Sequence, residues 1–291
     1  MRGFVSGNNC KIYFKPMDIN VLNRGGYSLY KKCLVWNGIP ADEIELSKRN
    51  AQKMIIDSGA WMLRNCYDWD CGKETNFWEV ICDKFFPIEK LPSKTRNQIR
   101  RCLRDCDIRI ISAQELINAN GYHVYKEAFN RYHDVSVGIS NRESWEDMID
   151  KDINHEFWGV FEKETGELIA WSMNTVDKRC VQYNTLKAIP EKMNKHYPYF
   201  GLLYEMNRYY LKEMGYDYVT DGWRSVTEHS GIQPFLEKNF LFRKAYTNMR
   251  LYYASWLKLV INILFPFRHI TLLPLNVRNV LKFEEINRLC S

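Results

Sequence analysis

The sequence predicts a mixed α/β fold, and residues 157–253 give the strongest indication of it. Residues 158–162 and 167–175 are short apolar stretches separated by the turn sequence Lys163-Glu164-Thr165-Gly166, which is typical of a β-hairpin. A third strand, a long helix, a strand, a second helix and a last strand are expected to follow with little intervening sequence. A hairpin that leads into alternating strands and helices commonly surrounds a cofactor cleft, so this is the region where we expect the chemistry.

The middle of this region is expected to contain a strand and a long helix. Residues 181–189 have strand character, and residues 200–214 carry apolar side chains at helical spacing. Gly215 follows as the residue type that most readily adopts the left-handed conformation at a helix end. The side chains expected on the buried face of this helix are Leu203, Met206, Tyr210 and Met214.

The end of the region combines two strands with a polar corner. A strand is expected at 216–221, followed by the polar corner 222–231. A helix at 232–239 and a strand at 240–253 complete the pattern. Polar residues at such a strand-to-helix corner are candidates for binding or catalysis.

Residues 1–90 have the character of an irregular, strand-rich first part. Strands are expected at 11–15, 27–36 and 77–86, and a polar helix at 40–55. The apolar positions of that helix are Ile44, Leu46, Ala51 and Ile55.

A strongly basic helix is expected at 94–105, directly after Leu91-Pro92-Ser93. One face is apolar and contains two cysteines, which favours buried thiols over a metal site because Cys102 and Cys106 lack zinc-type spacing. The cations on its other faces are Lys94, Arg96, Arg100, Arg101 and Arg104.

A helical segment is expected to follow this basic helix. Residues 108–111 have strand character, and Ser112-Ala113-Gln114-Glu115 has the form of a capping box at a helix start. Helices are expected at 120–132 and 144–150, with a polar loop at 133–141 between them.

The C-terminal tail, residues 256–291, differs from the rest in its apolar character. Its apolar run is only about a dozen residues long, whereas a helix that spans a bilayer needs about 20. The run either packs against the core or, with Arg250, Lys258 and Arg268 beside it, lies on a membrane surface.

Composition and charge bound the class of protein. Apolar residues make up 46% and aromatic residues 14% of the 291 residues, as expected of a folded globular chain. The net charge of +6 is too small for this length to indicate nucleic-acid binding by itself, although it is compatible with an anionic small molecule or membrane. The nine cysteines show no disulfide or metal pattern, and no signal peptide is apparent, so we expect a protein that is cytoplasmic or peripheral to the inner face of the membrane.

The order of these elements resembles the GNAT superfamily of acyl-CoA N-acyltransferases over residues 90–253. The basic stretch Leu91-Pro92-Ser93-Lys94-Thr95-Arg96-Asn97-Gln98-Ile99-Arg100-Arg101 is similar to the opening of the Fem-type branch, which includes the peptidoglycan-bridge aminoacyltransferases. The segment Phe235-Leu236-Glu237-Lys238-Asn239-Phe240 is similar to the junction of the last helix and strand of GNAT proteins.

The resemblance implies a GNAT-like, largely antiparallel twisted sheet flanked by helices. It places the acyltransferase domain at 91–255, after a strand-rich subdomain at 1–90 that would be a truncated lobe of the same fold, and before the tail at 256–291. It also implies acyl-CoA as co-substrate and no metal. Two family signatures are missing, because His196-Tyr197-Pro198-Tyr199-Phe200-Gly201 replaces the glycine-rich phosphate loop and Leu236 replaces the usual general-acid tyrosine.

The candidate site residues are drawn from the corner, the long helix and the basic helix. Acyl transfer to an amine needs a base, donors for the oxyanion and a grip on the donor's phosphates. As catalytic residues we expect Asp221, His229 and Glu205; for the cofactor Tyr197, Tyr199, Gly201, Arg96 and Arg100; and for the substrate Trp223, Arg224, Ser225 and Tyr204.

Each of these residues also has a purely structural interpretation. Ser225-Val226-Thr227-Glu228 and Ser230-Gly231-Ile232-Gln233 have capping-box form, so the polar corner can simply begin a helix. Helix glutamates and arginines are usually solvated, and tyrosines usually belong to the core or its rim. A hydrolase triad is disfavoured because the sequence has no Gly-x-Ser-x-Gly elbow.

Three functions remain open from the sequence. The leading one is an N-acyltransferase that moves an acyl group, expected to be acetyl from acyl-CoA, to an amine of a sugar or cell-envelope precursor. The second uses aminoacyl-tRNA as the donor, in which case nucleic acid becomes a partner. The third is a non-catalytic GNAT-like scaffold, whose tail at 256–268 contacts a partner or membrane.

Overall fold

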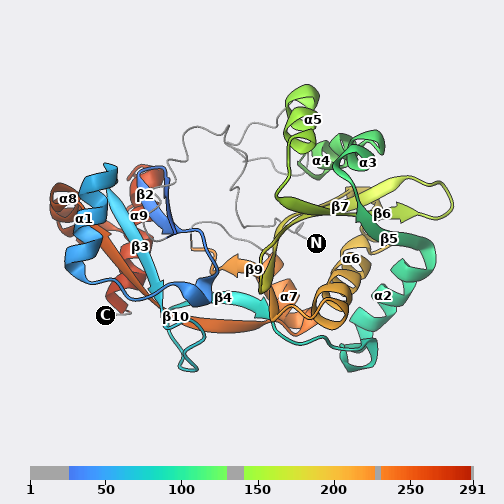
Figure 1. Cartoon of the computed structure of the whole chain (residues 1–291), viewed down its shortest axis with the longest axis horizontal. Coiled ribbons are helices and arrows are strands. Elements are labelled where there is room, and N and C mark those ends of the chain that lie inside the picture. The colour runs from blue at the N-terminus through green and yellow to red at the C-terminus, as the bar shows by residue number, and fades with distance from the viewer. Residues whose placement is uncertain (1–25, 130–140, 227–230, 290–291) are drawn as a thin grey trace. The chain divides into compact units, whose positions relative to one another are not determined.

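The computed structural model describes residues 26–129, 141–226 and 231–289 (Figure 1). Among these, residues 81–222 and 231–243 form one compact unit, here the first unit. Residues 26–80, 223–226 and 244–289 form the second unit. The predicted strand at 11–15 and loop at 133–141 fall almost entirely outside the described residues.

The first unit is built on five strands in the spatial order β9-β8-β7-β6-β5. Neighbouring strands are antiparallel from β5 to β8, whereas β8 and β9 are parallel. The predicted hairpin is β6–β7. The strands are β5 (Cys106–Ile111), β6 (His155–Glu162), β7 (Leu168–Val176), β8 (Cys180–Ala188) and β9 (Tyr218–Trp223), the last of which ends in the second unit.

Helices cover both faces of this sheet (Figure 1). On one face α6 packs on β5 to β8 and on α2, and on the other α3, α4 and α5 pack together, with contacts from α4 to β7 and β8. The helices are α2 (Ser93–Asp105), α3 (Ala113–Asn118), α4 (Gly121–Phe129), α5 (Arg142–Asp150), α6 (Pro198–Asn207) and α7 (Ile232–Phe240). The Ser112 hydroxyl accepts a hydrogen bond from the Glu115 N–H at 3.1 Å, as predicted for the start of α3.

The predicted long helix changes its winding half way. After α6 the chain continues as a π-helical segment, Arg208–Glu213, before Gly215 ends it with a φ of +72°. Leu203, Met206 and Tyr210 are buried as predicted, but Met214 is 54% exposed. The expectation for Met214 was wrong because a π-helix turns more slowly than an α-helix, so a 3.6-residue period no longer locates its buried face.

The second unit combines strands from both ends of the chain. The order is β1-β2-β3-β10, in which β10 pairs antiparallel with β3 from Asn248↔Tyr67 to Tyr253↔Met62. Helices α8 (Ser255–Leu264) and α9 (Leu275–Leu289) pack on this sheet through Ile261, Leu281 and Ile286. The strands are β1 (Tyr27–Tyr30), β2 (Cys33–Trp36), β3 (Met62–Tyr67) and β10 (Arg243–Tyr253), and β4 (Phe77–Cys82) crosses the boundary of the units.

The N-terminal helix is shorter than predicted. Only a single 3₁₀ turn, Pro40–Asp42, and the helix α1 (Lys48–Ser58) form within 40–58. Ala51 and Ile55 are buried as expected, whereas Ile44 lies before the helix and is exposed. The Ser47 hydroxyl accepts a hydrogen bond from the Asn50 N–H, and this N-cap sets the actual start of the helix.

The compact units combine segments that lie far apart in the sequence. One boundary lies at Ile81, and most of β10 and the tail group with the N-terminal strands. The reason is the antiparallel ladder between β3 and β10, which joins segments about 185 residues apart and leaves no local signal in the sequence.

Gly201 on α6 allows the close approach of α2 and β5. A Cβ at this position would lie 2.4 Å from Cys102 Sγ and 2.7 Å from Ile108 Cδ1. We therefore expect Gly201→Ala to lower the free energy of unfolding by about 1–3 kcal/mol through overpacking. Denaturant titration of the variant measures this loss.

A double variant tests the cause of that loss. Cys102→Ala removes the nearest atom, so the cost of Gly201→Ala is expected to be smaller in the Cys102→Ala background. Strictly additive costs would contradict the assignment of Gly201 to helix packing.

Candidate active site

The parallel strands β8 and β9 are paired over only three residues. The ladder runs from Cys180↔Tyr218 to Gln182↔Thr220, after which β8 continues to Ala188 without a further β9 pair. A β-bulge lies at the same level, because Met173 pairs with Thr185 and Asn174 with Tyr183. Bulges re-aim side chains and are frequent beside active sites. The strands therefore part where the sequence predicted a ligand site.

Asp221 is the first β9 residue after this ladder. Its side chain is 1% exposed and hydrogen-bonds with the Gln233 side chain of α7. Burial raises the pKa of the Asp221 carboxyl to about 8, and the hydrogen bond with Gln233 opposes that rise only in part. A carboxyl with a pKa near the working pH can both release and accept a proton, which is what general acid–base chemistry requires.

The amino end of α6 lies beside a polar, basic hollow. The helix starts with Pro198 at its first position, after Tyr197 in the left-handed conformation with φ 54°. Pro198 has no N–H and the Phe200 N–H donates to the Tyr197 carbonyl at 2.9 Å, so it is mainly the positive end of the helix dipole that favours an anion here. The hollow has a volume of about 560 Å³ and is lined by Ser93, Lys94, Asn97, Gln98, Arg101 and Tyr197.

Two cations from α2 give this hollow its charge. Lys94 and Arg101 line it, and the Arg101 guanidinium lies 5.7 Å from the centre of the Tyr197 ring. A cation over an aromatic face restricts both side chains. The arrangement suits a phosphate or another anionic group, held by charge from α2 and by the start of α6.

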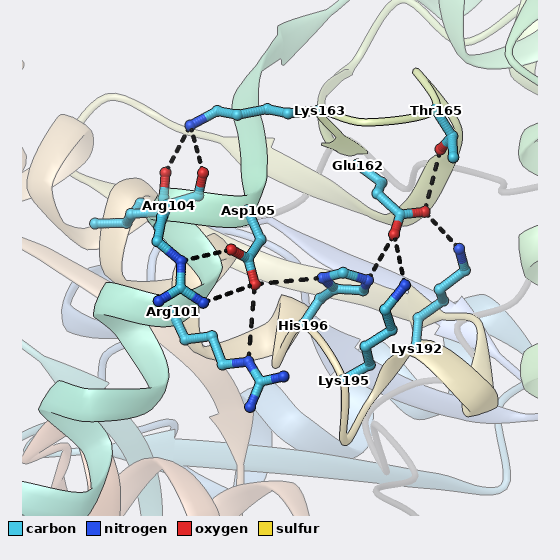
Figure 2. Close-up of polar contacts among 10 residues, drawn as sticks. Arg101, Arg104, Asp105, Glu162, Lys163, Thr165, Lys192, Lys195 and His196 are labelled. Carbon is cyan, nitrogen blue, oxygen red and sulfur yellow. Dashed lines mark hydrogen bonds and ion pairs between the residues drawn. The ribbon is translucent and has the colours of Figure 1, made fainter.

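A buried carboxylate fixes the segment that leads into α6 (Figure 2). Glu162, at the end of β6, is 2% exposed and accepts hydrogen bonds from Lys192 at 2.6 Å, Lys195 at 3.1 Å and Thr165 at 3.1 Å. His196 Nε2 lies 2.7 Å from the same carboxylate. The hydrogen bonds from Lys192 and the other donors lower the pKa of Glu162 to about 2.

His196 also faces the carboxyl end of α2 (Figure 2). Its Nδ1 lies 3.7 Å from an Asp105 oxygen, and Asp105 accepts a hydrogen bond from Arg104 Nε at 2.7 Å. That bond lowers the pKa of Asp105. The Lys163 ammonium donates to the last carbonyls of α2, those of Leu103 and Arg104. The network joins β6, α2 and residues 192–196 and so holds Tyr197 at the start of α6.

Three of the other four predicted cofactor residues, Tyr199, Gly201 and Arg96, have structural contacts. The Tyr199 hydroxyl donates to the Leu186 carbonyl at 3.3 Å, and Gly201 packs on Cys102. Arg96 donates to the carbonyls of Glu89 and Leu91, and Arg100 is exposed. Of the predicted cofactor residues, Tyr197 alone lines the hollow, among the residues that the structure describes.

The predicted residues Tyr204 and Glu205 lie on α6. The Glu205 carboxylate pairs with Arg208 at 2.7 Å, which in turn pairs with Glu213. The Tyr204 ring contacts Phe85, with ring centres 5.7 Å apart, and burial raises the pKa of its hydroxyl. Neither residue is brought into the hollow.

The polar corner is divided between the two units. Asp221 belongs to the first unit, whereas Trp223, Arg224 and Ser225 belong to the second. There Trp223 stacks on Phe77 and the Arg224 guanidinium lies 4.5 Å from the centre of the Trp78 ring. His229 falls outside the described residues.

The sequence analysis missed four of the residues that shape the site: Lys94, Arg101, Glu162 and His196. Cations occur on every face of α2 except the apolar one. Residue spacing alone therefore could not show whether Lys94 and Arg101 or Arg96 and Arg100 line the site. Glu162 was expected only as the last residue of the strand 158–162, and its position in the sequence gives no sign of its buried ion pairs. No group of three His, Cys, Asp or Glu side chains converges on a metal position in the part of the chain that the structure describes.

Comparisons with known proteins support the fold. No protein-family model matches the sequence, and no curated protein matches it. Among solved structures, FemX has a TM-score of 0.52 at 12% identity, over 74% of this chain and 80% of that chain. Weaker matches include L-PGS from Bacillus licheniformis, with TM-score 0.47, 13% identity and 91% and 84% coverage.

A GCN5-related N-acetyltransferase from Kribbella flavida also matches, with TM-score 0.35 and 9% identity over 75% of this chain and 79% of that chain. At such low sequence identities a structural similarity is evidence for the fold alone. The fold assignment rests on the match to FemX. The predicted GNAT-like fold class, with its mixed and largely antiparallel sheet, is confirmed, and the fold is similar to that of FemX.

The raised pKa of Asp221 has a consequence for stability. In the unfolded chain an aspartate titrates near pH 3.9, so the folded state retains a proton that the unfolded state has lost between about pH 4 and pH 8. Stability is therefore expected to fall as the pH rises through this interval, by at most about 1.4 kcal/mol per pH unit. Asp221→Asn should remove this contribution, and thermal unfolding from pH 5 to pH 8 measures it.

The exposed Asp217, which pairs with Arg179 at 2.7 Å, provides a matched control. As the pH rises, the melting temperature of Asp221→Asn is expected to increase relative to that of the wild type. The difference in melting temperature between Asp217→Asn and the wild type is expected to stay constant. Parallel curves for Asp221→Asn and the wild type would show that the carboxyl is ionised throughout.

Glu162 predicts the opposite pH dependence. Its folded pKa of about 2 lies below the unfolded value of about 4.3, so its contribution to stability is present above about pH 4.5 and is lost as the pH falls towards 2. Glu162→Gln is expected to cost about 1.5–3 kcal/mol at pH 7, because charged hydrogen bonds from Lys192 and Lys195 are lost, although Lys192 keeps its pair with Glu167 at 2.7 Å. Thermal unfolding should show that the difference in stability between the wild type and Glu162→Gln narrows below about pH 4.5. Glu164 is an exposed neighbour, and Glu164→Gln should have little effect on stability at any pH.

Proposed function

We propose that this chain is an N-acyltransferase that passes an acyl group from a phosphate-bearing carrier to an amine. The observation that carries the proposal is the buried Asp221 carboxyl at the point where the parallel strands β8 and β9 part. The basic hollow at the start of α6, in the same unit, supports it by offering a place for the carrier's phosphates.

The reaction assigns a plain role to Asp221. The amine attacks the acyl carbonyl, a C–N bond forms, and the tetrahedral intermediate collapses with loss of the carrier. The ammonium proton must leave the nitrogen, and the carrier's sulfur or oxygen must leave with its bonding electrons. With a pKa of about 8, Asp221 in its ionised form is a strong enough base to accept that proton.

The donor's phosphates are assigned to Lys94, Arg101 and the positive end of the α6 dipole. For acyl-CoA, which we propose as the donor, these groups would hold the pyrophosphate, and the acyl group transferred would be acetyl. The glycine-rich loop of other GNAT proteins is replaced here by charges from α2, with Tyr197 ordered by Arg101. The proposed acceptor is an amine of a sugar or cell-envelope precursor, in keeping with the Fem-type fold.

Aminoacyl-tRNA is the second candidate donor. The observation that favours it is the number of cations on α2, of which Lys94, Arg100, Arg101 and Arg104 are exposed. A polyanion can engage several of them at once, and the FemX structure has the same fold. The same Asp221 chemistry applies, with the ribose oxygen of the tRNA as leaving group.

Removal of the hollow's cations tests the donor site. Acetyl-CoA is expected to raise the melting temperature of the wild type, and Lys94→Ala and Arg101→Ala should each weaken its binding about tenfold through loss of a phosphate contact. Titration calorimetry gives the affinities. Arg142→Ala is the matched control, since Arg142 forms an i,i+4 pair with Glu146 on α5 just as Arg101 does with Asp105 on α2.

The same variants separate the two donors. If tRNA is the donor, RNA should bind with a steep dependence on salt, and Arg100→Ala and Arg104→Ala should weaken binding together with Arg101→Ala. Stabilisation by neither acetyl-CoA nor tRNA would contradict both donor assignments and leave a non-catalytic scaffold.

A further inference from the structure

The tail helix α8 has two different apolar faces. Ile261 is buried, and Leu257 and Leu264 pack with it against the core of the second unit. Their spacing of three and four residues places them on one side of the helix. The tail is thus an integral part of this unit, as the core-packing interpretation of the sequence expected.

The other apolar face of α8 is exposed. Trp256, Leu259, Val260 and Ile263 are all exposed, Leu259 by 64%. At about 100° per residue these four side chains lie within an arc of about 100°, beside the buried face. Exposed apolar side chains in a contiguous stripe, unlike scattered ones, mark a contact surface.

The segment after α8 continues this character. Phe267, Ile270, Leu272 and Leu275 are exposed, and Leu272 is 92% exposed in the connection to α9. At the other end of the helix, Trp256 contacts Trp61 edge to face with ring centres 5.3 Å apart, and the Trp61 side chain is itself about half exposed. Tryptophan is enriched where a protein meets the polar–apolar boundary of a bilayer.

The charge of this segment is of one sign. From Ala254 to Phe283 the sequence contains Lys258, Arg268, Arg278 and Lys282 and no aspartate or glutamate. The next carboxylates, Glu284 and Glu285, are paired with Arg288 and Arg268 at 2.8 and 2.9 Å. The segment thus combines an apolar stripe with an excess of cations and no carboxylate before Glu284, a combination that is complementary to an anionic, apolar surface.

We propose that α8 and the connection to α9 bind the surface of an anionic lipid bilayer, with the exposed stripe of α8 inserted among the acyl chains. No described helix is long and apolar enough to cross a bilayer. The ten residues of α8 extend over about 15 Å, half of the apolar thickness, so the helix lies in the plane of the interface. This inference does not depend on the proposed transfer activity.

Co-sedimentation of the full chain with vesicles tests the proposal. Vesicles of phosphatidylcholine mixed with phosphatidylglycerol are expected to bind the chain, and pure phosphatidylcholine vesicles to bind it much more weakly. The double substitution Leu259→Ser with Ile263→Ser should reduce binding to the mixed vesicles at least about tenfold, because two inserted side chains are lost. Lys258→Gln should reduce it about fivefold and leave binding to the neutral vesicles unchanged.

Ile153→Ser is the matched control, since Ile153 is 91% exposed, apolar and in the first unit. It should bind like the wild type, and thermal unfolding should show all variants folded because the substituted side chains are exposed. Equal binding of the wild type and the Leu259/Ile263 variant would overturn the proposal. The proposal would also be overturned if the wild type formed a dimer without lipid and the Leu259/Ile263 variant were a monomer. A second copy of the chain would then cover the stripe.

Discussion

The parallel pairing of β8 with β9 is the constraint on which the rest of the first unit depends. Two parallel neighbours need a crossover, and here α6 and its π-helical continuation provide it. The crossover must pack on the sheet, which requires Gly201 where α6 meets α2 and β5. It also brings the amino end of α6 to the basic side of α2, so the hollow and the charges around it follow from the same connection.

Two buried carboxyls of this unit show how environment alone separates their chemistry. Glu162 and Asp221 are almost equally inaccessible to solvent. Glu162 is surrounded by Lys192, Lys195 and His196 and is held as a carboxylate, which makes it a structural anchor. For Asp221 the effect of burial outweighs that of the hydrogen bond with Gln233, so its proton is retained to about neutral pH. Under the proposed function, proton transfer falls to Asp221 and positioning to Glu162.

The sequence could predict what is local. Hairpin β6–β7, helix α2 with its buried Cys102 and the end of the crossover at Gly215 all follow from short-range periodicity and turn chemistry, and the order of elements led to the GNAT-like fold. The pairing of β10 with β3 and the slow turn after α6 could not be predicted, because one depends on distant segments and the other on a change of helical period. In the site, Asp221 could be selected because it ends the predicted strand 216–221.

The burial of Asp221 depends on side-chain contacts that the spacing of residues in the sequence does not encode. The same is true of which cations of α2, Lys94 and Arg101 or Arg96 and Arg100, line the hollow. The two interpretations of the apolar tail illustrate the same limit. A run such as Trp256 to Phe267 is apolar on more than one side of a helix, so its pattern fits both a core helix and an interfacial one. The packing of Leu257, Ile261 and Leu264 accounts for one face and leaves Leu259 and Ile263 outside the core. The two interpretations are therefore compatible: burial of one face fixes the helix to the protein, and that attachment presents the other face as a rigid apolar surface.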